Sequence, residues 1–142
     1  MGKKRKLALY IDGENVPAKE SQKIFAEARK LGIIESAKVY GIKNDLSTRA
    51  WSQNSSETDK LEDIRLKGKP KKNKVDDRIK KDIEKDIHRK NIDTYIIVSS
   101  DHGYVSSVNM VRENGKKAVV MGGSHTSKKL KGSCNRYINL NP

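Results

Sequence analysis

The stretch that decides the fold is Leu7-Ala8-Leu9-Tyr10-Ile11, which is followed directly by Asp12-Gly13. An unbroken run of apolar and aromatic residues is typical of a strand that is buried on both faces of a sheet. The stretch Tyr95-Ile96-Ile97-Val98 has the same character and is followed by Ser99-Ser100-Asp101. Each stretch therefore predicts a buried strand of a parallel sheet, with an aspartate just beyond its carboxyl end.

Helical patterns separate the predicted strands. The first helix is expected to start at Asn15, a candidate cap, with Pro17 in its first turn, and to end at Gly32. Strands that alternate with helices predict an α/β fold, a three-layer sandwich with a central, mainly parallel sheet. The other expected strands cover residues 37–42, 61–66, 117–121 and 136–140, and the other expected helices cover residues 47–57, 75–90, 104–113 and 127–131.

Length and composition set limits on the class of protein. The 142 residues predict a single domain over 1–142, and 31 Lys and Arg against 18 Asp and Glu give a net charge of +13. No apolar stretch approaches a membrane span and no signal peptide is visible. The lone Cys134 excludes an internal disulfide framework and a Cys-rich zinc site. We expect an intracellular, cytoplasmic protein with no membrane partner.

The positive charge favours a polyanionic partner, most simply nucleic acid, over a basic surface that binds nothing. It is concentrated in an N-terminal tail over 1–6, in a loop over 66–74, and in the stretch after Glu113, which contains no acid. The lysines of the loop and of the last predicted helix are the candidate nucleic-acid contacts: Lys67, Lys69, Lys71, Lys72, Lys74, Lys128, Lys129 and Lys131.

The helix expected over 75–90 carries acids on its buried face. Asp76 and Asp86 fall within the apolar stripe and Asp82 lies on its edge. A carboxylate among isoleucines is costly unless it is paired, hydrogen-bonded or bound to a metal. For Asp76 the alternative is an acid that the helix dipole favours at an N-terminus. The stripe itself consists of residues that recur every four positions, Val75, Ile79, Ile83 and Ile87.

Ligands of parallel α/β sheets bind beyond the carboxyl ends of the strands, where Asp12, Asp76 and Asp101 are expected to meet. Mutual repulsion of three carboxylates is relieved by a hard divalent cation, Mg²⁺ or Mn²⁺. Such a cation supports hydrolysis of a phosphodiester. The sequence contains no nucleophile elbow, no phosphate-binding loop and no dinucleotide fingerprint, which disfavours those chemistries.

Four motifs follow one another along nearly the whole chain. They are Asp12-Gly13-Glu14-Asn15, Asn73-Lys74-Val75-Asp76 with Ile79 and Asp82 after it, Val98-Ser99-Ser100-Asp101, and the closing segment from Ser127 through Leu130 to Asn135-Arg136-Tyr137-Ile138-Asn139-Leu140. In kind and in order these motifs resemble those of NYN domains, a branch of the PIN-like nucleases. This resemblance implies a PIN-like, Rossmann-like α/β fold and metal-dependent cleavage of RNA.

On the matching positions, the resemblance implies that Asp12, Asp76 and Asp101 are the metal-binding catalytic acids. Asn15 corresponds to a polar group beside the first acid, and Ser99 belongs to the motif that carries the third. Asp82 matches a recurrent acid whose role, catalytic or structural, stays open.

Two positions depart from the family pattern. Gly103 stands where an acid often completes the cluster, and Asn135 stands where Asp is common. His102 is either a substitute ligand or phosphate contact, or an exposed turn residue.

The leading hypothesis is a metal-dependent endoribonuclease that acts on single-stranded or structured RNA, with Trp51 and Tyr104 stacking on bases. Trp51 has a second interpretation, as a packing or lid residue. The alternative hypothesis is an RNA-binding module on the same fold with weak or lost activity, which Gly103 and Asn135 favour. A hydrolase of small phosphates is a third possibility that leaves the charge unexplained. The sequence sets no oligomeric state.

Overall fold

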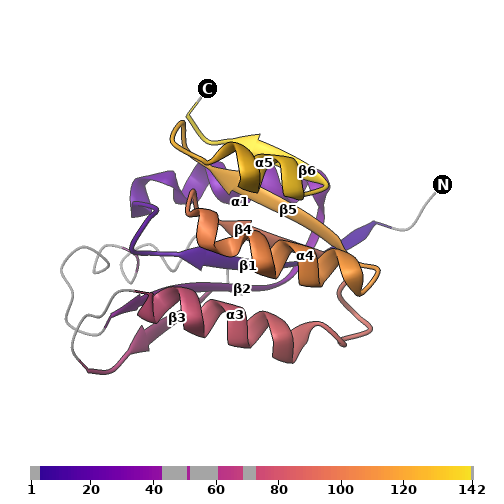
Figure 1. The fold of residues 1–142 in the computed structure, drawn as a ribbon, viewed down its shortest axis with the longest axis horizontal. Helices are drawn as coiled ribbons and strands as arrows, with labels where there is room; N and C mark the ends of the chain where they lie inside the picture. The colour runs from indigo at the N-terminus through magenta and orange to yellow at the C-terminus, as the bar shows by residue number, and fades with distance from the viewer. Residues whose placement is uncertain (1–3, 43–50, 52–60, 69–72, 142) are drawn as a thin grey trace.

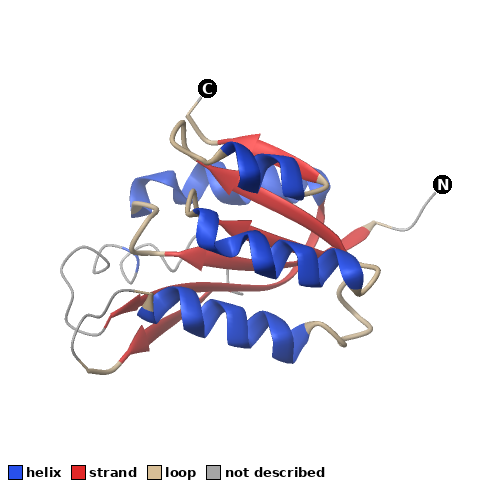
Figure 2. Cartoon of the chain, in the orientation of Figure 1, coloured by secondary structure: helices blue, strands red, loops and turns tan. Residues whose placement is uncertain are grey.

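The structure is a computed structural model that describes residues 4–42, 51, 61–68 and 73–141. Six strands of this described part form one sheet in the order β3-β2-β1-β4-β5-β6, and every neighbouring pair is parallel. Helices α3, α4 and α5 cover one face and α1 covers the other (Figures 1 and 2). The predicted three-layer, Rossmann-like α/β fold is confirmed.

The elements follow the predicted order. The strands are β1 (Arg5–Asp12), β2 (Gly32–Ile42), β3 (Leu61–Leu66), β4 (Thr94–Val98), β5 (Lys117–Gly122) and β6 (Arg136–Asn139), and the helices are η1 (Ala18–Glu20), α1 (Ser21–Leu31), α3 (Lys74–Asp86), η3 (His102–Tyr104), α4 (Val105–Glu113) and α5 (Lys128–Ser133), where η denotes a 3-10 helix.

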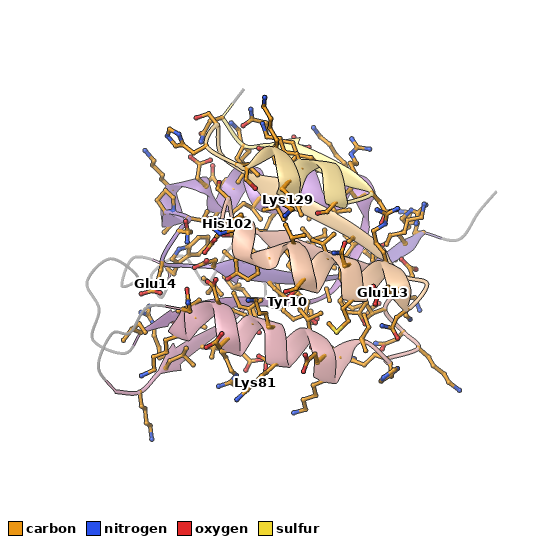
Figure 3. All side chains as sticks on the ribbon, in the orientation of Figure 1. Tyr10, Glu14, Lys81, His102, Glu113 and Lys129 are labelled. Carbon is orange, nitrogen blue, oxygen red and sulfur yellow. The ribbon has the colours of Figure 1, made fainter. Side chains whose placement is uncertain are left out.

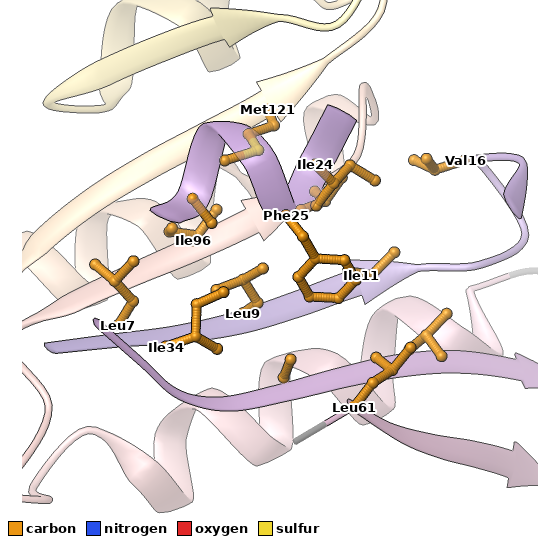
Figure 4. Close-up of a cluster of buried hydrophobic side chains, with 14 of the residues drawn as sticks. Leu7, Leu9, Ile11, Val16, Ile24, Phe25, Ile34, Leu61, Ile96 and Met121 are labelled. Carbon is orange, nitrogen blue, oxygen red and sulfur yellow. The ribbon is translucent and has the colours of Figure 1, made fainter. Parts of the chain in front are cut away.

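The central strand β1 is buried on both faces. Leu7, Leu9 and Ile11 belong to the cluster that faces α1 (Figure 4), whereas Ala8 and Tyr10 belong to the cluster under α3 and α4. Each large apolar side chain that is fully buried stabilises the fold by about 1.5–3 kcal/mol. This two-sided burial is why the run that predicted β1 is apolar throughout rather than alternating.

Two strands begin at least two residues earlier than predicted. β1 begins at Arg5, so the last two residues of the expected basic tail belong to the sheet, and β2 begins at Gly32 rather than at residue 37. Gly32 pairs with Arg5, and a Cβ atom at position 32 would lie 2.2 Å from the Arg5 carbonyl oxygen. Glycine therefore lets the chain pass from α1 into β2 without a loop, which hydrophobic periodicity does not reveal.

Two helix bounds were also wrong. α1 begins at Ser21, after the turn of η1, because the Asn15 side chain binds Asp12 instead of capping a helix. α3 ends at Asp86 rather than at residue 90, and the Arg89 N–H donates a hydrogen bond to the Asp86 carbonyl oxygen just after the end of the helix.

Within the described ranges, no helix is long and apolar enough to cross a membrane.

The helix expected over 47–57 lies outside the described residues except for Trp51. The Trp51 side chain is buried in the cluster that faces α1, and its Nε1 donates to the Val16 carbonyl oxygen at 2.9 Å. A buried ring cannot stack on an RNA base, so that prediction was wrong and the packing role is confirmed.

Candidate active site

Asp12 is the last residue of β1, and only 1% of it is exposed. Its Oδ1 accepts hydrogen bonds from the backbone N–H groups of Glu14 (3.2 Å) and Asn15 (3.3 Å), and its Oδ2 accepts from Asn15 Nδ2 at 3.1 Å. Gly13 allows this tight turn because a Cβ there would lie 2.6 Å from the Tyr40 carbonyl oxygen. The carboxylate is thus held in one orientation, and Asn15 lies beside it as predicted.

Tyr104 joins Asp12 to Asp76, which lies in the first turn of α3. The Tyr104 hydroxyl lies 3.0 Å from Asp12 Oδ2 and 3.1 Å from Asp76 Oδ1. The tyrosine itself is fully buried, so its predicted role in stacking on bases was wrong. Its hydroxyl instead links two carboxylates that lie 64 positions apart in the chain.

Asp101 caps η3, and its side chain is 28% exposed, more than that of the other two acids. Its Oδ1 accepts from the Gly103 N–H at 2.9 Å. Ser99 connects this acid to Asp12, because the Ser99 Oγ accepts from the Asp101 N–H (3.2 Å) and donates to Asp12 Oδ2 (3.3 Å). The three predicted acids therefore belong to one hydrogen-bonded network at the carboxyl edge.

Gly103 lies close against two of the acids. A Cβ atom at position 103 would lie 3.1 Å from Asp76 Oδ2 and 3.4 Å from Asp101 Oδ1. His102 lies at the surface next to Asp101, with 82% of its side chain exposed and its Nδ1 3.6 Å from Asp101 Oδ1 (Figure 3). Glycine at position 103 therefore lets the chain pass close to both carboxylates, and a larger residue there would require the Asp76 carboxylate to shift.

Burial raises the pKa of two acids of the cluster, and neighbouring charges raise that of Asp76 further. The pKa of Asp76 rises to about 6, first because the carboxyl is buried and then because the charges of Asp101 and Asp12 repel its own. Burial also raises the pKa of Asp12, while hydrogen bonds from Tyr104 and Asn15 oppose the rise. The cluster is therefore short of positive charge in a chain whose net charge is +13.

The other two acids of the α3 stripe differ from Asp76, because each has a cation nearby. Asp82 lies 3.1 Å from Arg78 Nε and also accepts a hydrogen bond from the hydroxyl of Tyr40 on β2. Asp86 lies 3.6 Å from Lys38 Nζ. Neither Asp76 nor Asp12 has an ion pair within the described part of the chain. Asp82 therefore joins α3 to the sheet, and Asp76 is the acid of this helix that a ligand would have to neutralise.

The donors suit a hard divalent cation in kind, because they are carboxylate oxygens. As placed, however, no three His, Cys, Asp or Glu side chains of the described residues form a group that could hold a metal ion together. Asp76 and Asp101 lie within hydrogen-bonding reach of each other, whereas Asp12 reaches Asp76 through Tyr104. The metal-ligand set of Asp12, Asp76 and Asp101 stays a prediction.

Comparisons with known proteins give the family. Residues 6–141 match the NYN domain family. The chain belongs to the NYN domain family. This is a PIN-like ribonuclease family, whose nucleases generally use divalent metals and whose substrate is generally RNA.

No curated protein matches the chain. Among solved structures the chain is similar to Plasmodium falciparum nicotinic acid mononucleotide adenylyltransferase complexed with NaAD. The identity is 11%, the match covers 97% of this chain and 75% of that chain, and the TM-score is 0.44.

A cavity of about 270 Å³ adjoins the acids of this NYN domain. It lies at the carboxyl edge of the sheet, where Rossmann-like folds bind ligands, and it is lined by Asn15, which binds Asp12, but by none of the three acids. No sequence pattern predicted this cavity, although Gly122-Gly123 directly after the strand expected over 117–121 marked the same edge. Its lining residues come from the segments that follow β1, β4, β5 and β6: Asn15, Val16, Pro17, Lys19, Glu20, Ser100, Gly123, Ser124, His125, Leu140 and Asn141.

The predicted lysines are only partly described. Lys69, Lys71 and Lys72 lie outside the described residues. Lys74 donates to the Lys67 carbonyl oxygen at the start of α3. On α5, Lys128 and Lys129 are exposed, whereas Lys131 lies over the ring of Tyr137 at 5.2 Å. Helices α3 and α5 lie on either side of α4 (Figure 1), so Lys74 at the start of α3 and the lysines of α5 do not form one cluster.

Asn135 is not part of the acid cluster. Its backbone and side chain pair with Ala118, near the start of β5, at the amino edge of the sheet. The acids lie at the opposite edge, so an amide at position 135 removes no carboxylate from them. The argument that Asn135 favours a decayed site was therefore wrong, and only Gly103 bears on that hypothesis.

Proposed function

We propose that this NYN domain is a metal-dependent endoribonuclease that hydrolyses phosphodiester bonds of RNA at the carboxyl edge of its sheet. The observation that carries the proposal is Asp76, which is buried beside Asp12 and Asp101 with no cation partner among the described residues. Like charges held together out of water cost free energy. A bound divalent cation would offset that cost. An acid with an ordinary structural role does not incur such a cost.

Asp76 and Asp101 are the proposed ligands of Mg²⁺ or Mn²⁺ next to Gly103, with Asp12 as the third acid. When bound, such an ion stabilises negative charge on a phosphate oxygen and lowers the pKa of a water molecule. Asn15 and Ser99 orient Asp12. The exposed His102 is the proposed contact to an adjacent phosphate.

The cavity beside Asp12 supports a nucleotide chain as substrate. Its volume of about 270 Å³ suits one nucleoside-sized group, with apolar side chains for the base and polar groups around them. Lys67, Lys69, Lys71, Lys72 and Lys74 on one side and Lys128, Lys129 and Lys131 on the other are the proposed phosphate contacts. We further propose that residues 1–142 form one domain that acts on single-stranded or structured RNA in the cytoplasm.

Cleavage of an end-labelled, mixed-sequence RNA at millimolar Mn²⁺ tests this function. Asp101→Asn should reduce cleavage by at least ~100-fold, because it removes a proposed ligand of the ion that stabilises the transition state, and it should weaken Mn²⁺ binding measured by calorimetry. Asp77→Asn is the matched control, because Asp77 lies next to Asp76 on α3 but is exposed. If purified wild-type protein leaves the RNA intact, the enzyme proposal is wrong.

One observation favours a second candidate function, an RNA-binding module with weak or lost activity. Position 103, which lies close to Asp76 and Asp101, is glycine where the family often has an acid. This candidate predicts wild-type protein that binds RNA but takes up no Mn²⁺ at millimolar concentration. The same calorimetric titration therefore separates the two functions.

A further inference from the structure

A second cavity lies at the amino edge of the sheet, opposite the acids. Its volume is about 220 Å³, and three of its lining residues are the cations Arg5, Lys117 and Arg136. These are the first residues of β1, β5 and β6. None of them belongs to the lysine groups assigned to RNA above.

The strand register explains why the three cations share one face. Alternation along each strand puts Arg5 on the side of Leu7 and Lys117 on the side of Val119, and both apolar residues belong to the cluster that faces α1. Arg136 pairs directly with Val119 in the parallel ladder. All three cations therefore lie on the α1 face, around the end of that helix.

Among the residues that the structure describes, no acid lines this cavity. Within the described ranges, Arg5, Lys117 and Arg136 form no ion pair. Asp93 lies at the same edge, but its carboxylate already accepts hydrogen bonds from the Lys6 N–H and the Thr94 hydroxyl. Three like charges around one small cavity repel one another, and an anion relieves that repulsion.

Asn135 also lines the cavity and is neutral. Its Oδ1 accepts the Ala118 N–H at 2.8 Å, a contact that an aspartate at this position would also make. The structure therefore offers a position where a negative charge can be added to the cavity with its backbone hydrogen bond retained.

We propose that this amino-edge cavity is a second phosphate-binding site, which holds the backbone of an RNA segment remote from the acids. Arginine binds phosphate through two parallel N–H groups, and two of the three cations are arginines. Arg5 and Asp12 are the two ends of β1, so about seven steps of roughly 3.3 Å, about 23 Å in all, separate the sites along the strand. The proposal rests on the RNA-binding part of the proposed function and not on cleavage.

The spacing makes the proposal testable by RNA length. At roughly 3.4 Å per stacked nucleotide, an RNA of about four nucleotides cannot fill both sites, whereas one of about thirty nucleotides can. Affinities for two such unstructured, labelled RNAs would be measured by fluorescence anisotropy with full-length protein, in EDTA to prevent cleavage.

The variant that combines Arg5→Gln, Lys117→Gln and Arg136→Gln should bind the long RNA about tenfold or more weakly. The plot of log affinity against log salt concentration should also become flatter, its negative slope decreasing in magnitude by about 2, because three phosphate contacts are lost. Binding of the short RNA should stay unchanged. A matched control removes three exposed cations from the outer side of α3 and the turn after it: Lys81→Gln, Lys85→Gln and Lys90→Gln.

Asn135→Asp is a second, conservative test, which should weaken binding of the long RNA by about threefold to tenfold. Equal losses in the triple variant and its control would overturn the proposal, because net charge alone would then explain them. Equal losses for the short and long RNA would also overturn it. So would tight binding of poly-glutamate that the triple variant abolishes, since the cavity would then be a site for acidic peptides.

The two proposals fail in different ways. Wild-type protein that shows the predicted length dependence but cleaves no RNA in Mn²⁺ contradicts only the catalytic proposal. Wild-type protein that cleaves RNA, with a triple variant that binds the long RNA normally, contradicts only the second site.

Discussion

The two edges of the sheet carry opposite charge and are built in different ways. At the carboxyl edge, Asp12 and Asp76 are buried, and hydrogen bonds from Asn15, Ser99 and Tyr104 hold the network together. At the amino edge, the charged ends of long side chains surround a cavity without ion pairs among the described residues. A buried charge costs free energy and is held in a fixed position, whereas an exposed charge costs little free energy and is mobile. The function proposed for the first edge therefore depends on geometry, and the function proposed for the second edge depends on charge.

The largest expected effect comes from Asp76→Asn. Cleavage should fall by at least ~100-fold, because a proposed metal ligand is lost. Without divalent ions, the same substitution should stabilise the protein at pH 7 by roughly 1–2 kcal/mol, because it removes a buried charge that Asp101 and Asp12 repel. Lys117→Gln at the other edge should change stability by less than about 0.5 kcal/mol. Urea unfolding in EDTA measures both variants.

The pH dependence of that gain has a definite sign. The pKa of Asp76 is about 6 in the folded protein and 3.8 ordinarily, so the folded state holds this proton more tightly than the unfolded chain. Wild-type stability should therefore fall relative to Asp76→Asn as the pH rises from about 4 to about 6. A difference between the two proteins that is constant over this range would contradict the unpartnered charge on which the comparison of the edges depends.

Tyr104→Phe should have the next largest effect. It keeps the buried ring but removes the hydroxyl that contacts Asp12 and Asp76, and hydrogen bonds to charged groups are worth about 1.5–3 kcal/mol. We expect a loss of about 2 kcal/mol in the free energy of unfolding. Tyr137→Phe, at a partly buried hydroxyl on the same side of the sheet, is the control and should cost less. Equal losses would mean that Tyr104 stabilises the fold without a particular role in the acid network.

Gly103→Asp should have the smallest effect. Unlike the substitutions that remove an acid, it should strengthen metal binding. The new carboxylate would lie beside Asp76 and Asp101, where its Cβ would be 3.1 Å from an Asp76 oxygen, so that carboxyl must shift slightly. A further oxygen ligand should raise Mn²⁺ affinity by about tenfold. Calorimetric titration measures the change, and unchanged or weaker affinity would show that the ion does not bind next to position 103.

Local pattern predicted much of the fold. Runs of apolar residues located β1 and β4, and the four-residue spacing from Val75 to Ile87 located α3 and its buried acids. The turn after β1 was harder to predict, because the Asn15 side chain could either cap a helix or bind Asp12. In the structure it binds Asp12. The passage from α1 directly into β2 at Gly32 depends on contact with Arg5 of another strand, which no local pattern contains.

The amino-acid sequence by itself determined that aspartates end buried strands, that the chain carries an excess of positive charge and that its strands are parallel. Only the tertiary structure decided which charges lack partners. Asp82 and Asp86 meet cations while Asp76 meets Asp101, and three cations from strands far apart in the chain surround one cavity. The reason is physical. Periodicity determines which face of an element a side chain points to, whereas strand order and register determine which residues it contacts on that face.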